Sequence, residues 1–336
     1  MTFSDLSTVI ARRQERIGRI TLNRPEALNA LDLAMMQAVH QALDEWRDDP
    51  AVHAVVIEGA GGRAFCAGGD IRLVRNLSLA GDQAGIEAFF IAEYAMNLAI
   101  ARYPKPYVSL IDGVCMGGGI GLSIHGSARV ATEAAMFAMP ETGIGLFPDV
   151  GASYALPRLR PGCGMYMALT GARLGGADAL WAGVATHYVS RETLAELADE
   201  IAEEGVAVLG SATVPTTDAL LPYAASHLRA FEADSVAGIV TRLADDGSDW
   251  ADEALHAIKT ASPSSVMWSF ELLRRGAGRT LEECLQAELA LTRHATRHPD
   301  FLEGVRAMVV DKDRAPRWSP SALAAVDQDA IAAIFA

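Results

Sequence analysis

Residues Phe65–Asp70 read FCAGGD, and a second glycine-rich stretch, GGG, stands at Gly117–Gly119. Each follows an apolar strand pattern, at Val52–Ile57 and at Tyr107–Ile111. Glycine lets backbone N–H groups point into a site because no side chain stands in front of them. Two such groups near one point form an oxyanion hole, which binds a carbonyl oxygen as it gains negative charge. The alternative is that these glycines serve only turns and close helix–sheet packing.

Strand and helix patterns alternate around these stretches. Ile17–Leu22 is predicted as a strand, and Asp32–Arg47 and Ile86–Arg102 as helices. Strands separated by helices favour an α/β fold with a parallel sheet. The pattern becomes mostly helical after residue 190, where Ser262 and Thr280 are predicted helix N-caps. We therefore predict a core domain over residues 1–190, with a helical region over residues 191–336 packed on it.

Composition limits the classes of partner. The chain has 336 residues and a net charge of −14, which argues against nucleic-acid binding. The longest stretch without Asp, Glu, Lys or Arg, residues 113–128, is too short and glycine-rich to cross a membrane. The four cysteines have no metal-ligand spacing and no secretory signal precedes them. We expect reduced thiols, a cytoplasmic protein, and no metal site.

Two other catalytic signatures are incomplete. Gly59–Ala64 fits the G-x-G-x-x-A pattern of dinucleotide sites, but no helix pattern follows it. Gly121–His125 is similar to a nucleophile elbow around Ser123, yet the closing glycine is missing. Ser123 is therefore predicted to be a helix residue packed on the sheet.

A third stretch carries two carboxylates in a loop rich in proline and glycine. Residues Met139–Gly151 read MPETGIGLFPDVG, with Glu141 and Asp149 among apolar residues, prolines and glycines. A carboxylate in apolar surroundings tends to have a raised pKa, which suits acid–base catalysis, and it can also act as a nucleophile. The alternatives are two solvated loop acids, or Asp149 as a helix cap.

Together these stretches resemble the enoyl-CoA hydratase/isomerase (crotonase) superfamily. The resemblance rests on ITLNRP at Ile20–Pro25, LNAL at Leu28–Leu31, FCAGGD at Phe65–Asp70 and DGVCMGGG at Asp112–Gly119. It implies an α/β fold with a crotonase-like ββα spiral core that binds acyl-CoA thioesters, followed here by a helical C-terminal region.

The resemblance also implies the positions of the site residues. The oxyanion hole falls on the backbone N–H groups of Gly69 and Gly118. The pocket for the CoA adenine and its neighbouring turn fall on Ala67, Gly68, Asp70, Ile71, Ala27 and Leu28.

The acidic residues distinguish the subgroups of this superfamily. Crotonase-type hydratases use two glutamates, whose positions here are Gly121 and Glu141, so one acid is missing. The chain is instead similar to the 3-hydroxyisobutyryl-CoA hydrolases, thioesterases of valine catabolism, whose pattern Met139–Gly151 matches. The similarity continues through Ala261–Ser265, Glu303–Ala307, Asp311–Asp313 and Pro316–Trp318, with Arg317 standing where the subgroup pattern has lysine.

This resemblance implies roles for three acids. Glu141 would act on the thioester carbon, either as a nucleophile through an anhydride or as a base for water. Asp149 would orient the substrate hydroxyl, or position and activate water. Glu93 would contact the substrate, and the alternative for Glu93 is a solvated helix face.

The predicted function is therefore hydrolysis of 3-hydroxyisobutyryl-CoA, or a similar short 3-hydroxyacyl-CoA, to the free acid and CoA. Hydration or isomerisation of enoyl-CoA on the same fold remains an alternative, as does a catalytically silent acyl-CoA-binding protein. No cofactor is implied, since CoA enters as part of the substrate. Relatives in the superfamily commonly form trimers, so a homo-oligomer is expected.

Overall fold

The computed structural model describes residues 7–212 and 218–335. By internal packing these residues form two compact units that are interleaved along the sequence. The first unit comprises the described parts of Met1–Gly69, Ala92–Ala138 and Leu174–Pro222, and the second those of Asp70–Ile91, Met139–Arg173 and Tyr223–Ala336. The predicted boundary at residue 190 does not coincide with a boundary between these units. The assignment of a catalytic core to residues 1–190 and of a helical region to residues 191–336 stays a prediction.

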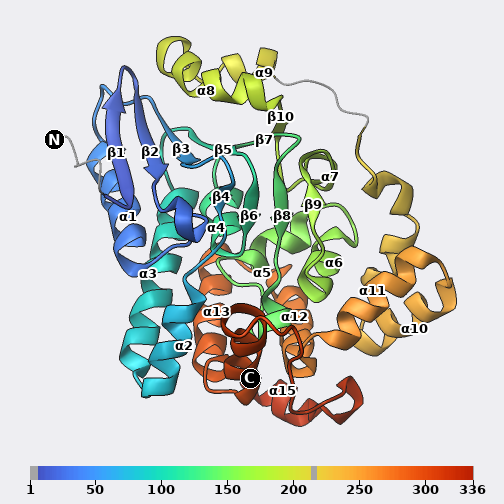
Figure 1. The fold of residues 1–336 in the computed structure, drawn as a ribbon. Coiled ribbons are helices and arrows are strands. Elements are labelled where there is room, and N and C mark those ends of the chain that lie inside the picture. Colours follow the sequence, from blue (N-terminus) through green and yellow to red (C-terminus); the bar gives the residue numbers. More distant parts are fainter. Residues whose placement is uncertain (1–6, 213–217, 336) are drawn as a thin grey trace. The chain divides into compact units, whose positions relative to one another are not determined.

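The first unit contains two sheets (Figure 1). The larger has the strand order β1-β2-β3-β5-β7-β10, in which only the β1–β2 pair is antiparallel. Its strands are β1 (Val9–Gln14), β2 (Ile17–Leu22), β3 (Ala54–Gly59), β5 (Tyr107–Ile111), β7 (Ala128–Ala131) and β10 (His187–Tyr188). The predicted strand at Tyr107–Ile111 is confirmed with the same bounds, and the predicted parallel pairing is confirmed from β2 to β10.

The smaller sheet has the order β4-β6-β8-β9. Its strands are β4 (Ala64–Cys66), β6 (Val114–Met116), β8 (Met136–Ala138) and β9 (Leu174–Gly175). The pairs β4–β6 and β6–β8 are parallel, so the carboxyl ends of these three strands lie at the same edge. The two glycine-rich stretches follow β4 and β6 and therefore leave the sheet at that edge.

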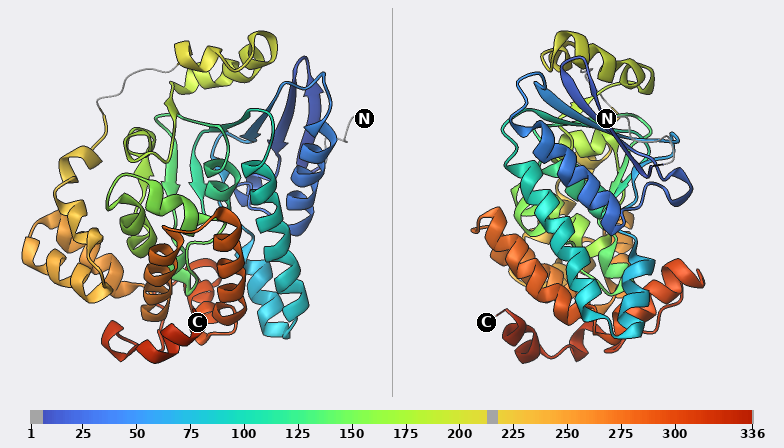
Figure 2. Two further views of the ribbon diagram at one scale, coloured as in Figure 1. Left: turned by 180° about the vertical axis from the view of Figure 1, so that it is seen from behind. Right: turned by 90° about the vertical axis from the view of Figure 1, so that its left-hand side faces the viewer.

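Five helices belong to the first unit. They are α1 (Leu33–Arg47), α4 (Gly118–Ile124), α7 (Gly176–Ala182), α8 (Arg191–Glu204) and α9 (Val208–Ala212). Helix α1 runs alongside β1 and β2 (Figure 2). It begins at the predicted place, since Asp32 is its N-cap and accepts a hydrogen bond from the Met35 N–H. Ser123 lies buried in α4, as predicted, and donates to helix carbonyls rather than acting as a nucleophile.

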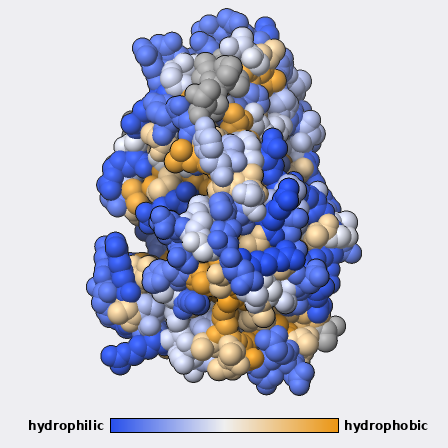
Figure 3. Space-filling view, turned by 90° about the vertical axis from the view of Figure 1, so that its right-hand side faces the viewer, coloured by the Kyte–Doolittle hydropathy of each residue, from blue (hydrophilic) through white to orange (hydrophobic). Residues whose placement is uncertain are grey.

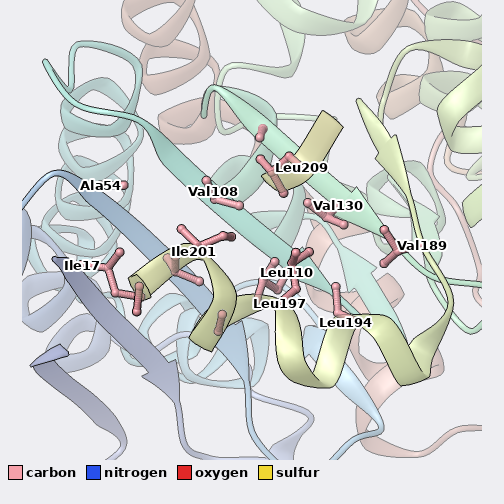
Figure 4. Packing of buried hydrophobic residues seen from close by; sticks show 14 residues of the cluster. Ile17, Ala54, Val108, Leu110, Val130, Val189, Leu194, Leu197, Ile201 and Leu209 are labelled. Atoms are coloured by element: carbon pink, nitrogen blue, oxygen red, sulfur yellow. The ribbon is translucent and has the colours of Figure 1, made fainter. Parts of the chain in front are cut away.

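Helix α8 packs its apolar face on the larger sheet (Figure 4). Leu194, Leu197 and Ile201 recur at helical spacing, and each is buried against strand residues such as Val108 and Val130. A fully buried Leu or Ile contributes roughly 1.5–3 kcal/mol relative to an exposed one. This helix comes after residue 190, yet it belongs to the unit that holds the sheets, because its apolar face completes their core.

The second unit is almost entirely helical. Its helices are α2 (Ile71–Ala80), α5 (Ala152–Ala155), α6 (Cys163–Thr170), α10 (Val236–Asp246), α11 (Asp249–Thr260), α12 (Pro263–Gly276), α13 (Leu281–Ala295), α14 (Pro299–Val305) and α15 (Gln328–Ile334). A core of Phe231, Ile239, Leu255, Ile258 and Phe270 joins α10, α11 and α12.

The predicted caps of α12 and α13 are confirmed. Ser262 accepts from the Ser265 N–H with Pro263 at the first helical position, and Thr280 forms a capping box with Glu283. Gly276 is the last residue of α12, and the structure shows why a glycine stands there. A Cβ there would collide with the carbonyl of Ser153, so the glycine permits close packing of α12 on α5.

Helix α3 (Gln83–Ala101) runs from the second unit into the first. It corresponds to the helix predicted over Ile86–Arg102. By length and composition it is the one helix in the described residues that could cross a membrane, a test that core helices of water-soluble proteins also pass. Its buried acid Glu93 suits a protein interior better than a lipid environment.

The face of the protein drawn in Figure 3 is mainly hydrophilic, with hydrophobic residues in smaller groups between the polar ones. Such a surface agrees with the 42 acidic and 28 basic residues of the chain, because charged side chains are mostly exposed.

Candidate active site

The two predicted oxyanion glycines lie close together in the first unit. Gly69 follows β4, and Gly118 begins α4 directly after β6. A Cβ built on Gly118 would lie 3.1 Å from the Gly69 nitrogen and would collide with Glu93 Oε1. A Cβ at residue 118 would require the Glu93 carboxylate to shift and would press on the Gly69 nitrogen, so glycine suits this close approach. These contacts place the Gly69 backbone beside Gly118, while the convergence of their N–H groups on one oxygen stays a prediction.

The chain before Gly69 is held by the Ala27–Leu28 turn and by Leu31. Gly68 has a φ of +104°, a conformation that glycine adopts without strain. Its carbonyl accepts from the Leu31 N–H (2.8 Å), and the Ala67 N–H donates to the Leu28 carbonyl (3.0 Å). The predicted adenine-pocket residues Ala67 and Gly68 therefore lie beside the predicted turn.

Asp70 and Ile71 belong to the second unit instead. Ile71 is the first residue of α2, and Asp70 is its N-cap, whose carboxylate accepts from the Leu73 N–H (3.4 Å). A helix-capping contact of Asp70 is therefore present in the structure, while contacts of Asp70 and Ile71 with CoA stay a prediction.

Glu93 is buried on α3, with only 2% of its surface exposed, so the solvated-face alternative is wrong. Its carboxylate lies against Gly118, as the collision above shows. Burial, with a smaller contribution from the Glu93 charge, raises the pKa of the nearby Cys66 thiol to about 12. Cys66 is therefore not an activated nucleophile.

Glu141 and Asp149 lie in the second unit, and each is 5% exposed. Glu141 is the first residue of the short 3-10 helix η2 (Glu141–Ile144). Burial raises its pKa well above the ordinary value, and the negative charge of Asp149 raises it further. Glu141 Oε2 has no hydrogen-bond partner within the described part of the chain. A buried carboxylate oxygen left in this state is suited to meet a substrate or water.

Both alternatives for Asp149 are wrong. It is not solvated, since it is 5% exposed, and it does not cap α5, whose N-cap is Gly151. The chain makes a sharp turn directly after it. Val150 and Gly151 have φ values of +55° and +80°, and the Ala152 N–H donates to the Asp149 carbonyl (2.8 Å).

A third buried acid, Glu288 on α13, was missed by the sequence analysis. Its carboxylate accepts from the Gly151 N–H (2.7 Å), the Ser153 N–H (3.0 Å) and the Ser153 hydroxyl (2.6 Å). Burial and the Asp149 charge raise its pKa to about 8, against the lowering effect of these hydrogen bonds. A signal was present, because Glu288 occupies the apolar stripe of α13, between Leu281, Leu285 and Leu291.

The Glu141 loop is held from the C-terminal side of the same unit. The Ser262 N–H donates to the Thr142 carbonyl (3.0 Å). A Cβ on Gly145 would collide with the Asp300 backbone, and one on Gly304 would collide with Ile144. The stretches that carry the resemblance near residues 262 and 304 therefore pack directly against the loop that bears Glu141.

Over residues 7–212 and 218–335, no group of three or more His, Cys, Asp or Glu side chains could hold a metal ion. The four cysteines are buried and unbridged.

The comparisons with known proteins agree with this architecture. The family model described as enoyl-CoA hydratase/isomerase matches residues 17–335. The chain belongs to the enoyl-CoA hydratase/isomerase family. Among curated relatives, the mitochondrial 3-hydroxyisobutyryl-CoA hydrolase of Xenopus tropicalis is 46% identical over 95% of this chain and 86% of its own length. That of Homo sapiens is 42% identical over 96% of this chain and 86% of its own.

Two solved structures share the whole fold. A carnitinyl-CoA dehydratase from Mycobacterium thermoresistibile has a TM-score of 0.93 at 38% identity, covering 98% of this chain and 96% of that one. An enoyl-CoA hydratase from Rhodobacter sphaeroides 2.4.1 has a TM-score of 0.93 at 40% identity, covering 98% and 97%. The predicted crotonase fold with its helical C-terminal region is confirmed.

One expectation is contradicted. The sequence analysis expected a cytoplasmic protein because no secretory signal or oxidised cysteine pattern is present. The curated relatives at 42–46% identity are named as mitochondrial proteins, so that inference from composition was wrong. Net charge and reduced cysteines do not distinguish between compartments with similar redox conditions.

Proposed function

We propose that this protein hydrolyses the thioester of 3-hydroxyisobutyryl-CoA, or of a similar short 3-hydroxyacyl-CoA, to the free acid and CoA. The proposal rests chiefly on Glu141, a buried acid with a raised pKa and an unpartnered oxygen, in a chain 42–46% identical to curated 3-hydroxyisobutyryl-CoA hydrolases. The reaction consumes one water and releases the CoA thiol. It needs no metal or redox cofactor.

Backbone donors and acids have separate roles in the proposed chemistry. The N–H groups of Gly69 and Gly118 would bind the thioester oxygen as it becomes an oxyanion, and Glu93 would contact the substrate. Glu141 would attack the thioester carbon or remove a proton from water, and Asp149 would orient the substrate hydroxyl or the water. A carboxylate needs its negative form for either route, so Glu141 would act at a pH near or above its raised pKa.

The anhydride and general-base routes differ in where labelled oxygen goes. In the anhydride route, water that attacks the glutamyl carbonyl leaves its oxygen in Glu141, and the free acid departs with an original Glu141 oxygen. Water that attacks the acyl carbonyl of the anhydride, or the thioester directly, leaves its oxygen in the free acid only. Label in the Glu141 peptide after hydrolysis in ¹⁸O-water therefore identifies an anhydride, whereas its absence is expected for direct attack and for opening at the acyl carbonyl.

Hydration of an enoyl-CoA is the second candidate, because the two solved structures above are named as a hydratase and a dehydratase. The position of the second hydratase glutamate is occupied by Gly121, which supplies no acid. Isomerisation needs fewer fixed groups and remains a variant of this alternative.

The deciding experiment is release of free thiol from 3-hydroxyisobutyryl-CoA beside hydration of crotonyl-CoA. Prompt thiol release with little hydration is the expected result. Hydration without thiol release would contradict the proposal. A parallel assay with 3-hydroxypropionyl-CoA measures acyl selectivity, which we expect to be modest because one methyl in an apolar pocket is worth about 1–3 kcal/mol. The trimer-based homo-oligomer stays a prediction.

A further inference from the structure

Glu288 is a fully buried carboxylate in the middle of α13, 135 residues along the chain from Ser153, its nearest partner in sequence. A protein keeps a carboxylate in its interior only where hydrogen bonds compensate for the lost water. All three of its described hydrogen bonds come from a single turn. Oε2 accepts from the Gly151 N–H, and Oε1 accepts from both the N–H and the hydroxyl of Ser153.

That turn has an unfavourable backbone conformation. Val150 is β-branched and has a φ of +55°, a region that such residues rarely occupy, and Gly151 follows at +80°. A strained conformation persists only where surrounding contacts enforce it. Glu288 provides such contacts, because two of its hydrogen bonds fix the backbone N–H groups on the C-terminal side of Val150.

Asp149 immediately precedes this turn, and its carbonyl accepts from the Ala152 N–H inside it. A change in the turn would therefore move the Asp149 carboxylate. The two acids are also close enough for the Asp149 charge to act on Glu288. Glu288 itself is occupied by its three donors, so it is not arranged to attack a substrate.

We propose that Glu288 is a positioning residue for the proposed hydrolysis: by accepting hydrogen bonds from Gly151 and Ser153 it holds the Val150–Gly151 turn and so sets the place of Asp149. This inference rests on the proposed function for its catalytic consequence. The hydrogen bonds themselves can be tested without it.

The first test is Glu288→Gln, compared with wild type in thiol release from 3-hydroxyisobutyryl-CoA. Glutamine keeps the size and one acceptor oxygen, but its amide group places a donor opposite the Gly151 N–H. We expect kcat to fall by about 10²-fold, the cost of a small misplacement of a catalytic group, with KM nearly unchanged. Ser153→Ala, which removes one of the three hydrogen bonds, is expected to cause a smaller loss.

Thr292→Ala is the matched control, one turn further along α13. The Thr292 hydroxyl donates only to the Leu289 carbonyl of its own helix (2.8 Å). This variant should keep kcat, so that a loss in Glu288→Gln is not a general effect of altering α13. Folding of every variant is checked by thermal unfolding.

The double variant Asp149→Asn with Glu288→Gln shows whether the two losses in kcat are independent. A purely structural role of Glu288 would give independent, multiplicative losses. If Glu288 acts through Asp149, its substitution adds little to the loss caused by Asp149→Asn. Multiplicative losses, or a folded Glu288→Gln variant with kcat within about twofold of wild type, would overturn the proposal.

Failure of the proposed function is recognised separately. If wild type releases no thiol, hydrogen exchange at the amides of Gly151 and Ser153 decides the positioning role. Faster exchange in Glu288→Gln than in Thr292→Ala supports it, and equal exchange overturns it.

Discussion

The two compact units carry different kinds of candidate functional group. In the first, the predicted functional atoms are the backbone N–H groups of Gly69 and Gly118, and a Cβ on Gly118 would press on Glu93 and on the Gly69 nitrogen. In the second, they are the buried carboxylates of Glu141 and Asp149, and burial together with the Asp149 charge raises the pKa of Glu141. The backbone donors depend first on which positions carry glycine, which the sequence shows directly, whereas the raised pKa of Glu141 depends on burial and on the Asp149 charge, which only the fold shows.

The largest loss of activity is expected from a change to Glu141, the side chain to which we assign the chemistry. Glu141→Gln removes the nucleophile or base while keeping nearly the same shape. We expect kcat for thiol release to fall by about 10³-fold or more, with thermal stability unchanged or raised because a buried charge is removed. Steady-state kinetics and calorimetry measure both. A folded variant with more than a tenth of wild-type activity would assign the chemistry elsewhere.

Gly118→Ala tests the backbone side of the comparison. The added Cβ would collide with Glu93 Oε1 and press on the Gly69 nitrogen, so the two N–H groups would separate. Loss of one oxyanion donor costs about 10²–10³-fold in kcat, and we expect a loss of that size.

The control is Gly210→Ala on α9, where a Cβ meets no atom within 4 Å. It should leave activity unchanged and stability equal or slightly higher. If Gly118→Ala were equally harmless, the proposed oxyanion role would be wrong.

The pH dependence of kcat/KM tests the two acids of the second unit, Glu141 and Asp149. Activity should rise with pH through the pKa of Glu141, because the carboxylate is the reactive form, and this limb should lie well above the ordinary glutamate pKa of 4.5. Asp149→Asn removes a charge that raises this pKa, so the residual activity should have its limb at lower pH. Asp149→Glu keeps the charge and should keep the limb near its wild-type position. An unshifted limb in Asp149→Asn would mean that the two acids do not interact.

The smallest effects are expected from removing the N-cap residues of two helices, one in each unit. Asp32→Ala removes the cap of α1 in the first unit and should lower the free energy of unfolding by about 1 kcal/mol, with activity unchanged. Ser262 caps α12, but its hydroxyl also donates to the buried Asp300 carboxylate (2.6 Å). Ser262→Ala should cost about 2–3 kcal/mol and also reduce activity, because α12 supports the Glu141 loop. Equal losses measured by denaturant unfolding would contradict this coupling.

Much of the molecule could be predicted from local sequence. The strand at Tyr107–Ile111, the caps at Ser262 and Thr280, and the helical role of Ser123 follow from short-range patterns and were confirmed. The α2 helix and its Asp70 cap were not foreseen, because the resemblance had assigned these residues to the adenine pocket. Solvent exposure of Glu93 and Asp149 was left open, since an acid in a helix or loop carries no local sign of burial.

The sequence by itself determined the family, the two glycine stretches and the acids at residues 141 and 149, because each depends on residue identity within a short segment. Only the tertiary structure decided which acids are buried, that Glu288 holds the turn after Asp149, and that residues on both sides of 190 share one sheet core. The physical reason is that burial and electrostatic coupling arise from contacts such as that between residues 151 and 288. Their strength depends on distance in space and not on position along the chain.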